Sequence, residues 1–258
     1  MQPELYILIL LCLFAFLAGF VDSIVGGGGL IQLPAGFILL PQMPIATVIG
    51  SLKVSAFTGT AFAAQQYLQK IKVKWKQVSI MAAIAFCAAF AGSQLLTVVS
   101  NQYMKPIIFV VMIATAIYTY TKKNFGQASH RVITPQQEWK YSILISVVIG
   151  FYDGFIGPGA GSFFIVSFIG ILGFDFLKAS AHAKLVNLAT NLGSIFLFLL
   201  KGSILWSIAI PMAISNGLGG ILGARLAIYK GNQFIRVFFL LVVIATLFRF
   251  GWDIYRDL

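Results

Sequence analysis

Two lysines inside long apolar segments are the residues with the clearest chemical meaning. Lys53 follows Ser51 in the apolar segment 45–68, and Lys184 lies in a comparable segment of the second half of the chain. A charged side chain in a hydrocarbon layer costs several kcal/mol unless it is paired or hydrated, so such residues face the protein interior. We therefore expect both ammonium groups to point toward an anionic substrate.

Three other ionisable residues lie in the apolar part of the chain. Asp22 and Asp153 could neutralise the lysines, cap short helices, or carry protons or another ion. His182 could exchange protons near neutral pH, or it could be a hydrogen-bonded packing residue. The sequence leaves these alternatives open.

A glycine-rich segment follows each aspartate. Glycine permits positive φ and lets a ligand approach backbone N–H groups, and a helix that begins after the glycines presents the positive end of its dipole. Two such breaks facing each other would form an anion site, whereas the alternative is that the glycines only allow tight helix packing. Their duplication beside an acid favours the anion site. The glycines of this site are Gly26, Gly27, Gly28, Gly29, Gly157, Gly159 and Gly161.

Neutral polar side chains accompany the lysines. Asn187 and Asn191 lie one helical turn apart and share a face with Lys184, and Ser51 precedes Lys53 in the other half. Their side chains could donate hydrogen bonds to the oxygens of an oxyanion, or they could join helices to one another. We include all three in the candidate substrate site.

The amino-acid composition indicates that these residues lie in a membrane protein. The chain has 258 residues, of which 59% are hydrophobic and 10% charged, against about 45–50% and about 25% in soluble domains. A soluble enzyme is therefore excluded, and we expect a multi-pass protein of the cytoplasmic membrane. The net charge of +11 comes from lysines and arginines between the apolar segments, as in cytoplasmic loops, so we expect no nucleic-acid partner.

The usual motifs of catalysis and cofactor binding are missing from the sequence. Cys12 and Cys87 have no metal-ligand spacing, and Gly26 to Gly29 lack the Lys-Ser/Thr that completes a nucleotide-binding loop. We therefore expect no metal, no cofactor and no enzymatic activity.

The sequence contains an internal duplication with an offset of 131 positions. The offset aligns Asp22 with Asp153 and Lys53 with Lys184 without a gap. His182 aligns with Ser51, so the candidate site is only pseudo-symmetric. Other matched positions are Gly26 and Gly157, Gly28 and Gly159, Lys70 and Lys201, Trp75 and Trp206, and Gly92 and Gly223.

The distribution of positive charge predicts opposite orientations for the two repeats. Loop 70–76 carries four lysines and its partner 201–206 carries one, whereas loop 101–105 carries one and its partner 225–236 carries three basic residues. If positive loops are cytoplasmic, the two repeats are inverted, which requires an odd number of crossings in each.

Two short apolar segments, 30–40 and 163–173, supply the additional crossing. About 11 residues reach only about 17 Å of a roughly 30 Å hydrocarbon core. We therefore predict an all-α polytopic membrane protein in which each repeat has a broken helix pair and three spanning helices, with about 8–10 membrane segments in total. The predicted units are a first repeat at 5–120, a cytoplasmic linker at 121–140 and a second repeat at 141–252.

The doubled motif resembles the TauE/SafE sulfite-exporter family, also called the toluene-sulfonate uptake permease family. The resemblance rests on Gly19-Phe20-Val21-Asp22 with Gly26 to Gly29, and on Gly150-Phe151-Tyr152-Asp153 with Gly157-Pro158-Gly159. It covers nearly the whole chain. Membership implies transport of small sulfur-containing anions such as sulfite, sulfonates or thiosulfate by a secondary mechanism.

The functional hypothesis is a secondary transporter of such anions that works by alternating access in the lipid bilayer. The anion would bind between Lys53, Lys184 and the two glycine breaks, with protons as a candidate coupling ion. A passive anion channel on the same scaffold is the alternative, because broken helices also build channels. A membrane-embedded enzyme would need a nucleophile and base, and a structural subunit would not explain two buried lysines.

Overall fold

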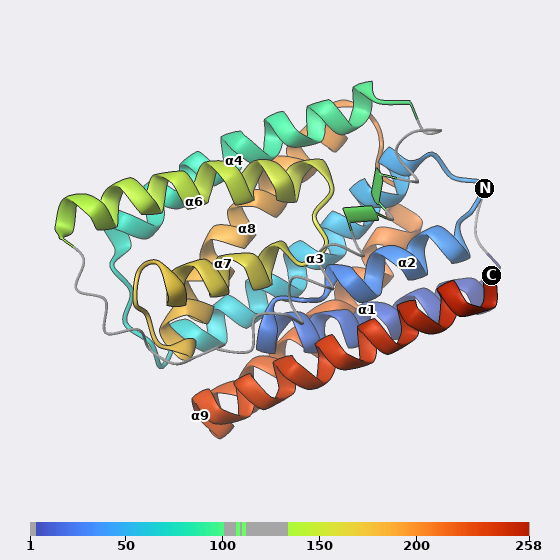
Figure 1. The fold of residues 1–258 in the computed structure, drawn as a ribbon. Helices are drawn as coiled ribbons and strands as arrows, with labels where there is room; N and C mark the ends of the chain where they lie inside the picture. The colour runs from blue at the N-terminus through green and yellow to red at the C-terminus, as the bar shows by residue number, and fades with distance from the viewer. Residues whose placement is uncertain (1–3, 101–106, 109, 112–133, 258) are drawn as a thin grey trace.

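A computed structural model describes residues 4–100, 107–108, 110–111 and 134–257 of the chain. Secondary structure in this part is helical, which confirms the predicted class (Figure 1). Most of the apolar segment 107–120, a further expected membrane span, and most of the predicted linker lie outside the described residues. The helices are α1 (Leu5–Val25), α2 (Gly29–Leu39), α3 (Ile45–Leu68), α4 (Trp75–Val98), α6 (Pro135–Phe155), α7 (Ala160–Gly170), α8 (Phe176–Leu200) and α9 (Trp206–Asp257).

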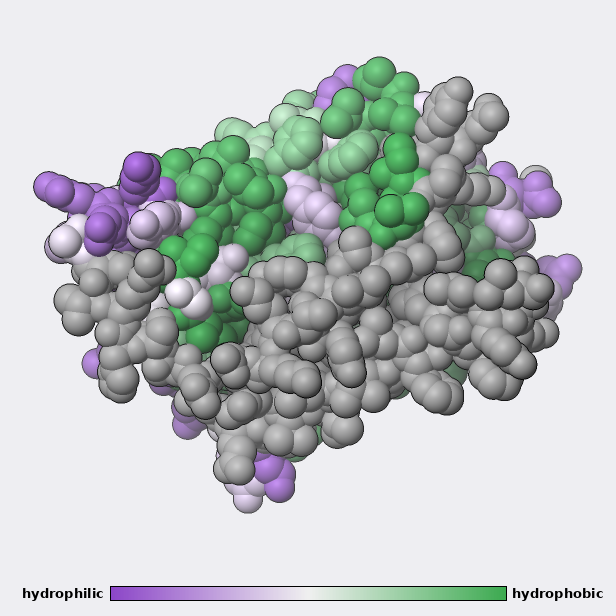
Figure 2. All heavy atoms as spheres, in the orientation of Figure 1, coloured by the Kyte–Doolittle hydropathy of each residue, from purple (hydrophilic) through white to green (hydrophobic). Residues whose placement is uncertain are grey.

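Five of the described helices are long and apolar enough to cross a membrane. They are α1, α3, α4, α8 and the part of α9 from Trp206 to Gly231, where positive φ at Gly231 divides that helix. Exposed apolar side chains continue along α6, including Leu144, Val148 and Phe151. Figure 2 shows this apolar surface over α4 and α6, with hydrophilic side chains at the end where α6 begins.

Helix α6 begins inside the range predicted as linker. Thr134 and Gln137 form a reciprocal capping box, and Pro135 occupies the first turn, where its missing N–H is not needed. Glu138 in the same turn pairs with Lys74 at 2.8 Å. The start of α6 and the loop between α3 and α4 therefore lie at the same end of the molecule.

Both predicted broken helix pairs are present. Helix α1 ends at Val25 and α6 at Phe155, and the helices that follow, α2 and α7, have 11 residues each. The two pairs enter from opposite ends of the molecule, and their breaks meet in its middle (Figure 1). The short segments predicted from hydropathy are therefore half-helices too short to span a bilayer.

The two breaks cross with their backbones in contact. Ser162 donates from its N–H to the Gly26 carbonyl at 3.0 Å and from its hydroxyl to the Val25 carbonyl at 2.8 Å. Gly26 has φ of 80°, and a Cβ there would overlap the backbone of Gly161 and Ser162. Glycine is required here both by the left-handed conformation and by the close approach of the second chain segment.

Contacts between the halves place loop 201–205 and Arg225 of α9 toward opposite ends of α3. The Leu205 N–H donates to Ser51 Oγ at 2.9 Å near the start of α3, and Arg225 Nε donates to Gln66 Oε1 at 3.0 Å near its end. Loop 201–205 therefore lies far from loop 70–76, its counterpart in the first repeat. Inverted repeats require this placement; the inverted topology and the division into repeats stay predictions.

Two apolar clusters surround the crossing. One contains Phe164 and Phe168 of α7 and Tyr67 of α3, all fully buried. The other joins Leu11 of α1 to Phe198 of α8. Helix packing on both sides holds the broken segments in place.

Candidate functional site

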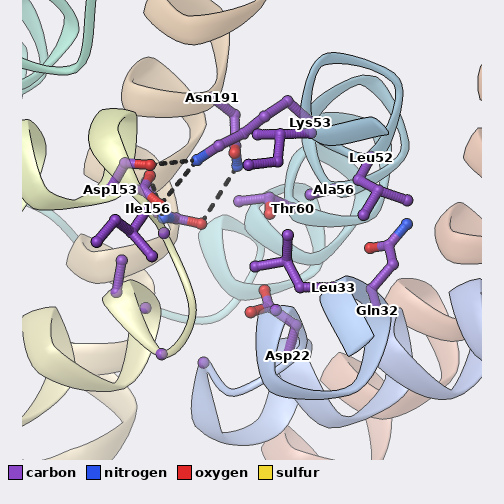
Figure 3. A pocket seen from close by; sticks show the side chains of 18 residues that line it. Asp22, Gln32, Leu33, Leu52, Lys53, Ala56, Thr60, Asp153, Ile156 and Asn191 are labelled. Atoms are coloured by element: carbon purple, nitrogen blue, oxygen red, sulfur yellow. Dashed lines mark hydrogen bonds and ion pairs between the residues drawn. The ribbon is translucent and has the colours of Figure 1, made fainter. Parts of the chain in front are cut away.

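A cavity of about 60 Å³ lies where the two broken pairs meet α3 and α8 (Figure 3). This volume accommodates a few water molecules or one small oxyanion. The wall contains five glycines of the candidate site, namely Gly26, Gly29, Gly157, Gly159 and Gly161. It also contains the predicted polar residues Asp22, Lys53, Asp153, Asn187 and Asn191.

Lys53 and Asp153 form a buried ion pair on one side of the cavity (Figure 3). Lys53 Nζ donates to Asp153 Oδ1 and to the Asp153 carbonyl, each at 2.8 Å. The other carboxylate oxygen, Oδ2, accepts from Thr190 Oγ1 and from Asn187 Nδ2, the latter at 3.2 Å. Both oxygens of Asp153 are therefore engaged by donors, as a buried carboxylate requires.

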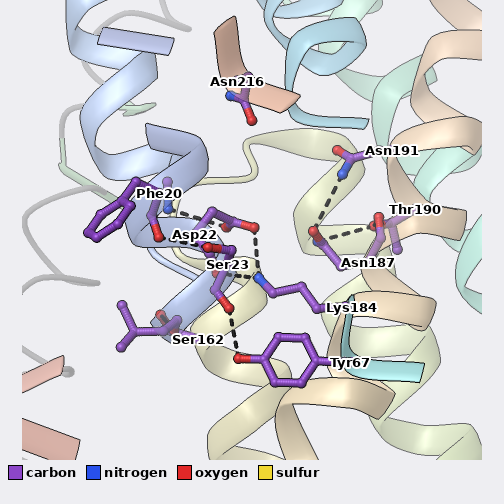
Figure 4. Close-up of polar contacts among 12 residues, drawn as sticks. Phe20, Asp22, Ser23, Tyr67, Ser162, Lys184, Asn187, Thr190, Asn191 and Asn216 are labelled. Atoms are coloured by element: carbon purple, nitrogen blue, oxygen red, sulfur yellow. Dashed lines mark hydrogen bonds and ion pairs between the residues drawn. The ribbon is translucent and has the colours of Figure 1, made fainter. Parts of the chain in front are cut away.

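Lys184 and Asp22 form the matching pair (Figure 4). Lys184 Nζ donates to Asp22 Oδ2 at 2.7 Å and to the Asp22 carbonyl. Asp22 Oδ1 accepts from the Gly28 N–H at 3.3 Å. Each lysine thus pairs with the aspartate of the other half of the chain, and this matches the neutralising role that the sequence left open for the two acids.

The two ion pairs differ in how exposed their side chains are. In the first pair the Lys53 side chain is 9% exposed and that of Asp153 is 4% exposed; in the second, Lys184 is 1% and Asp22 is 20% exposed. Lys184 is absent from the cavity wall. Lys53, Asp153 and Asp22 therefore line the cavity, and Asp22 is the more exposed of the two carboxylates.

Besides Lys184, four predicted site residues do not line the cavity: Gly27, Gly28, Ser51 and His182. The Ser51 hydroxyl donates to the Thr47 carbonyl and accepts from Leu205. His182 packs its ring against Phe174, with ring centroids 4.8 Å apart, and its Nδ1 lies 2.7 Å from the Lys178 carbonyl. The structure thus places both side chains at helix contacts away from the cavity.

We expect Ser51→Ala to leave anion binding by the protein unchanged and to reduce stability by about 1 kcal/mol, the usual net contribution of a hydrogen bond. The reason is that Ser51 joins α3 to the loop before α9 and does not line the cavity. Titration of the purified variant with thiosulfate, together with thermal unfolding in detergent, measures both quantities. Loss of binding with normal unfolding would place Ser51 in the substrate site after all.

Sequence reasoning missed several polar residues of this region. Thr190 contacts Asp153, and Gln32 and Thr60 line the cavity. Thr190 could have been found, because it lies three residues after Asn187 and so shares its helix face. Gln32 was hard to identify from the sequence, because its hydrogen bonds to Ser55 at 2.8 Å and Asn216 at 3.3 Å depend on tertiary packing.

The arrangement suits a small anion rather than a metal ion. The N-terminal residues of both half-helices, Gly29 of α2 and Ala160 of α7, lie in the cavity wall, so the positive ends of two helix dipoles adjoin it. Among the described residues no group of three His, Cys, Asp or Glu side chains could hold a metal. Lys53 and the amides of Asn187 and Asn191 add donors for oxyanion oxygens.

Comparison with known proteins identifies the family. The family model of the sulfite exporter TauE/SafE matches residues 11–250. A probable membrane transporter protein, ORF9 of Sinorhizobium sp., is 36% identical over 95% of this chain and 92% of its own length. The probable membrane transporter YfcA of Escherichia coli K12 is 32% identical over 88% of this chain and 83% of its own.

A probable membrane transporter protein of Haemophilus influenzae is 35% identical, covering 88% of each chain. No solved structure gives a significant match. The family and relatives' names indicate a membrane transporter rather than an enzyme. With its apolar helices and its match over most of its length, the chain belongs to the sulfite exporter TauE/SafE family and is a multi-pass membrane protein.

Proposed function

We propose that this protein is a secondary transporter of small sulfur-containing oxyanions, of the size and charge of sulfite, sulfonates or thiosulfate. The observation that carries the proposal is the cavity at the crossing of the two broken helix pairs, into which Lys53 projects. The family name, sulfite exporter, supports a sulfur oxyanion as cargo.

Electrostatics supports an anion as the occupant. The two ion pairs cancel in formal charge, so the sign of the site depends on which groups reach the cavity and on the backbone. Two half-helix N-termini adjoin the cavity, and each is equivalent to roughly half a positive charge. Together with the Lys53 ammonium, they offer an oxyanion charge-assisted hydrogen bonds at little cost in reorganisation.

The way in which the two halves meet supports alternating access. The cavity is bounded by elements of both halves, so rocking of one half against the other would open it to one side of the membrane and then to the other. Lys53 on α3 and Asp153 on α6 belong to different halves, so this ion pair would lie at the contact about which the halves turn and would keep its partners. Rocking of the two halves would then open and close the path to the cavity and change the contacts within the cavity little.

We expect Lys53→Ala to abolish flux of radiolabelled sulfite or thiosulfate into proteoliposomes, because it removes the ammonium that reaches the cavity. Lys70→Ala is the matched control, since Lys70 is an exposed lysine after α3 and should transport normally. Size-exclusion profiles confirm that both variants are folded. Undiminished flux in folded Lys53→Ala would reject the site.

The same proteoliposomes separate a transporter from a passive channel. A carrier that rocks on each cycle saturates and exchanges anions across the membrane, whereas a channel passes currents far above carrier turnover. We expect saturable exchange and no unitary currents in planar bilayers. Resolved single-channel currents would replace alternating access with the channel mechanism.

A further inference from the structure

The two aspartates occupy equivalent positions in the sequence but unequal surroundings. Asp153 accepts from Lys53 on one oxygen and from Asn187 and Thr190 on the other, and its side chain is 4% exposed. Within the described residues, Asp22 accepts from Lys184 on one oxygen and has on the other only the 3.3 Å contact from the Gly28 N–H. Its side chain is 20% exposed and lines the cavity.

The cause of the difference lies in α3. The offset of 131 positions aligns Asn187 with Ala56 and Thr190 with Gly59, so α3 lacks the two side chains that would bond Asp22. Gly59 also has no room for a side chain, because a Cβ there would overlap the Asn216 side chain. The asymmetry is therefore built into the packing of α3 against α9.

We propose that Asp22 is the group that takes up a proton when the anion binds, while Asp153 stays ionised and anchors Lys53. The coupling ion of the transporter is then the proton. This inference rests on the proposed function, since it assigns the coupling group of the same cavity. The proton comes from water on one side of the membrane, binds one oxygen of the Asp22 carboxylate, and returns to water on the other side.

Repulsion between the bound anion and the Asp22 carboxylate would couple anion binding to proton uptake. An anion beside Lys53 shares the cavity with the Asp22 carboxylate, and two negative charges in a poorly solvated space repel each other strongly. A proton on Asp22 removes this repulsion, so anion and proton each increase the affinity for the other by the same factor.

Protonation does not leave the Lys184 ammonium without a partner. Lys184 also donates to the Asp22 backbone carbonyl, a contact that is independent of the charge on the carboxylate. Lys53 has the equivalent bond to the Asp153 carbonyl, so the two acids differ in the donors to their second carboxylate oxygen. Protonation of Asp153 would also weaken its bonds from Thr190 and Asn187, whereas Asp22 has only the Gly28 N–H there. Of the two acids, Asp22 is the one that can change its charge at lower cost.

Few other ionisable groups surround Asp22. Helices α2 and α7 contain none. From α3, the buried Tyr67 donates its hydroxyl to the Ser23 carbonyl. Of the groups on the described parts of neighbouring elements, Lys184 pairs with Asp22, and Lys53 and Asp153 line the same cavity. The others are Glu138, Lys140, Tyr141 and Tyr152 on α6, Lys178 and His182 on α8, and Arg225, Tyr229 and Lys230 on α9.

Proton uptake on anion binding tests the assignment. Thiosulfate or methanesulfonate, neither of which takes up a proton near neutral pH, is added to the purified protein in weakly buffered detergent solution with a pH indicator. Over a series of starting pH values, wild type should take up at most about one proton for each anion bound. Asp22→Asn should bind the anion more tightly, without pH dependence and without proton uptake.

The matched control is Asp175→Asn, which makes the same chemical change at the N-cap of α8, where Asn is as good a cap as Asp. This control should take up protons as wild type does. If Asp22→Asn does not fold, Asp22→Asn/Lys184→Met removes both charges of the pair and should likewise bind without proton uptake. Asp22→Glu, which keeps a carboxylate, should retain the uptake.

The outcomes separate this inference from the proposed function. Anion binding by wild type with no proton uptake at any pH overturns the inference and leaves the proposed transport intact. Uptake that persists in folded Asp22→Asn overturns the assignment to Asp22. Failure of wild type to bind either anion overturns both proposals.

Discussion

We expect Gly26→Ala to yield no folded protein in detergent extracts and Gly27→Ala to yield folded protein at close to the wild-type level. Gly26 has φ of 80° and lies against the backbone of Gly161. A Cβ at positive φ costs about 1–3 kcal/mol, and overlap with the backbone of the second break cannot be relieved by a change of rotamer. Fluorescence-detected size exclusion of the two variants measures the difference.

Gly27 is the appropriate control because it lies in the same glycine run. The nearest atom to a Cβ at Gly27 is Ser162 Oγ at 3.8 Å, an ordinary contact distance. A general sensitivity of the glycine run would damage both variants equally. Folded Gly26→Ala at the wild-type level would show that the two breaks do not cross with their backbones in contact.

Asp153→Ala lowers the free energy of unfolding by about 3–5 kcal/mol, the usual effect of removing one partner from a buried ion pair. The substitution leaves the Lys53 ammonium in a site where its side chain is 9% exposed. It also leaves Thr190 and Asn187 without their acceptor. Thermal unfolding in detergent, at a pH where the pair is charged, measures the loss.

The double variant Asp153→Ala/Lys53→Met tests whether the unpaired Lys53 ammonium causes the loss of stability. Removing the unpaired charge should restore a large part of the lost stability, because the penalty comes mainly from burying Lys53 alone. Additive effects of the two substitutions would contradict the ion pair. Asp22→Asn should lower the free energy of unfolding less than Asp153→Ala does. Asp22 is more exposed than Asp153, and asparagine keeps the shape of the aspartate side chain.

The elements of the site could be predicted from the sequence because the patterns that indicate them are formed by residues close together in the chain. Glycine runs next to an acid predicted the breaks in both pairs, and the short apolar segments predicted half-helices, now seen as α2 and α7. Buried lysines predicted an interior polar site because charge in an apolar segment needs a partner. The doubled motif led to the family that the comparison identifies.

Pairing across the halves did not follow from the sequence. Which aspartate meets which lysine depends on how α3 and α8 pack against the breaks, and no periodicity encodes that choice. The inclusion of Ser51 could have been questioned on helix geometry, since residues two apart point to roughly opposite sides of a helix. Contacts place Ser51 beside Leu205 and Lys53 beside Asp153.

The bonds from Ser162 to Gly26 and Val25 fasten the two halves together at the cavity itself. In the proposed rocking motion this contact would lie at the axis of rotation, and displacement in a turning body grows in proportion to distance from the axis. Leu68 at the end of α3 lies about 22 Å along the helix from Lys53. A rotation large enough to open a passage at that distance would leave an anion at the axis nearly stationary, so its bonds to the site would keep their lengths while the ends of the helices move.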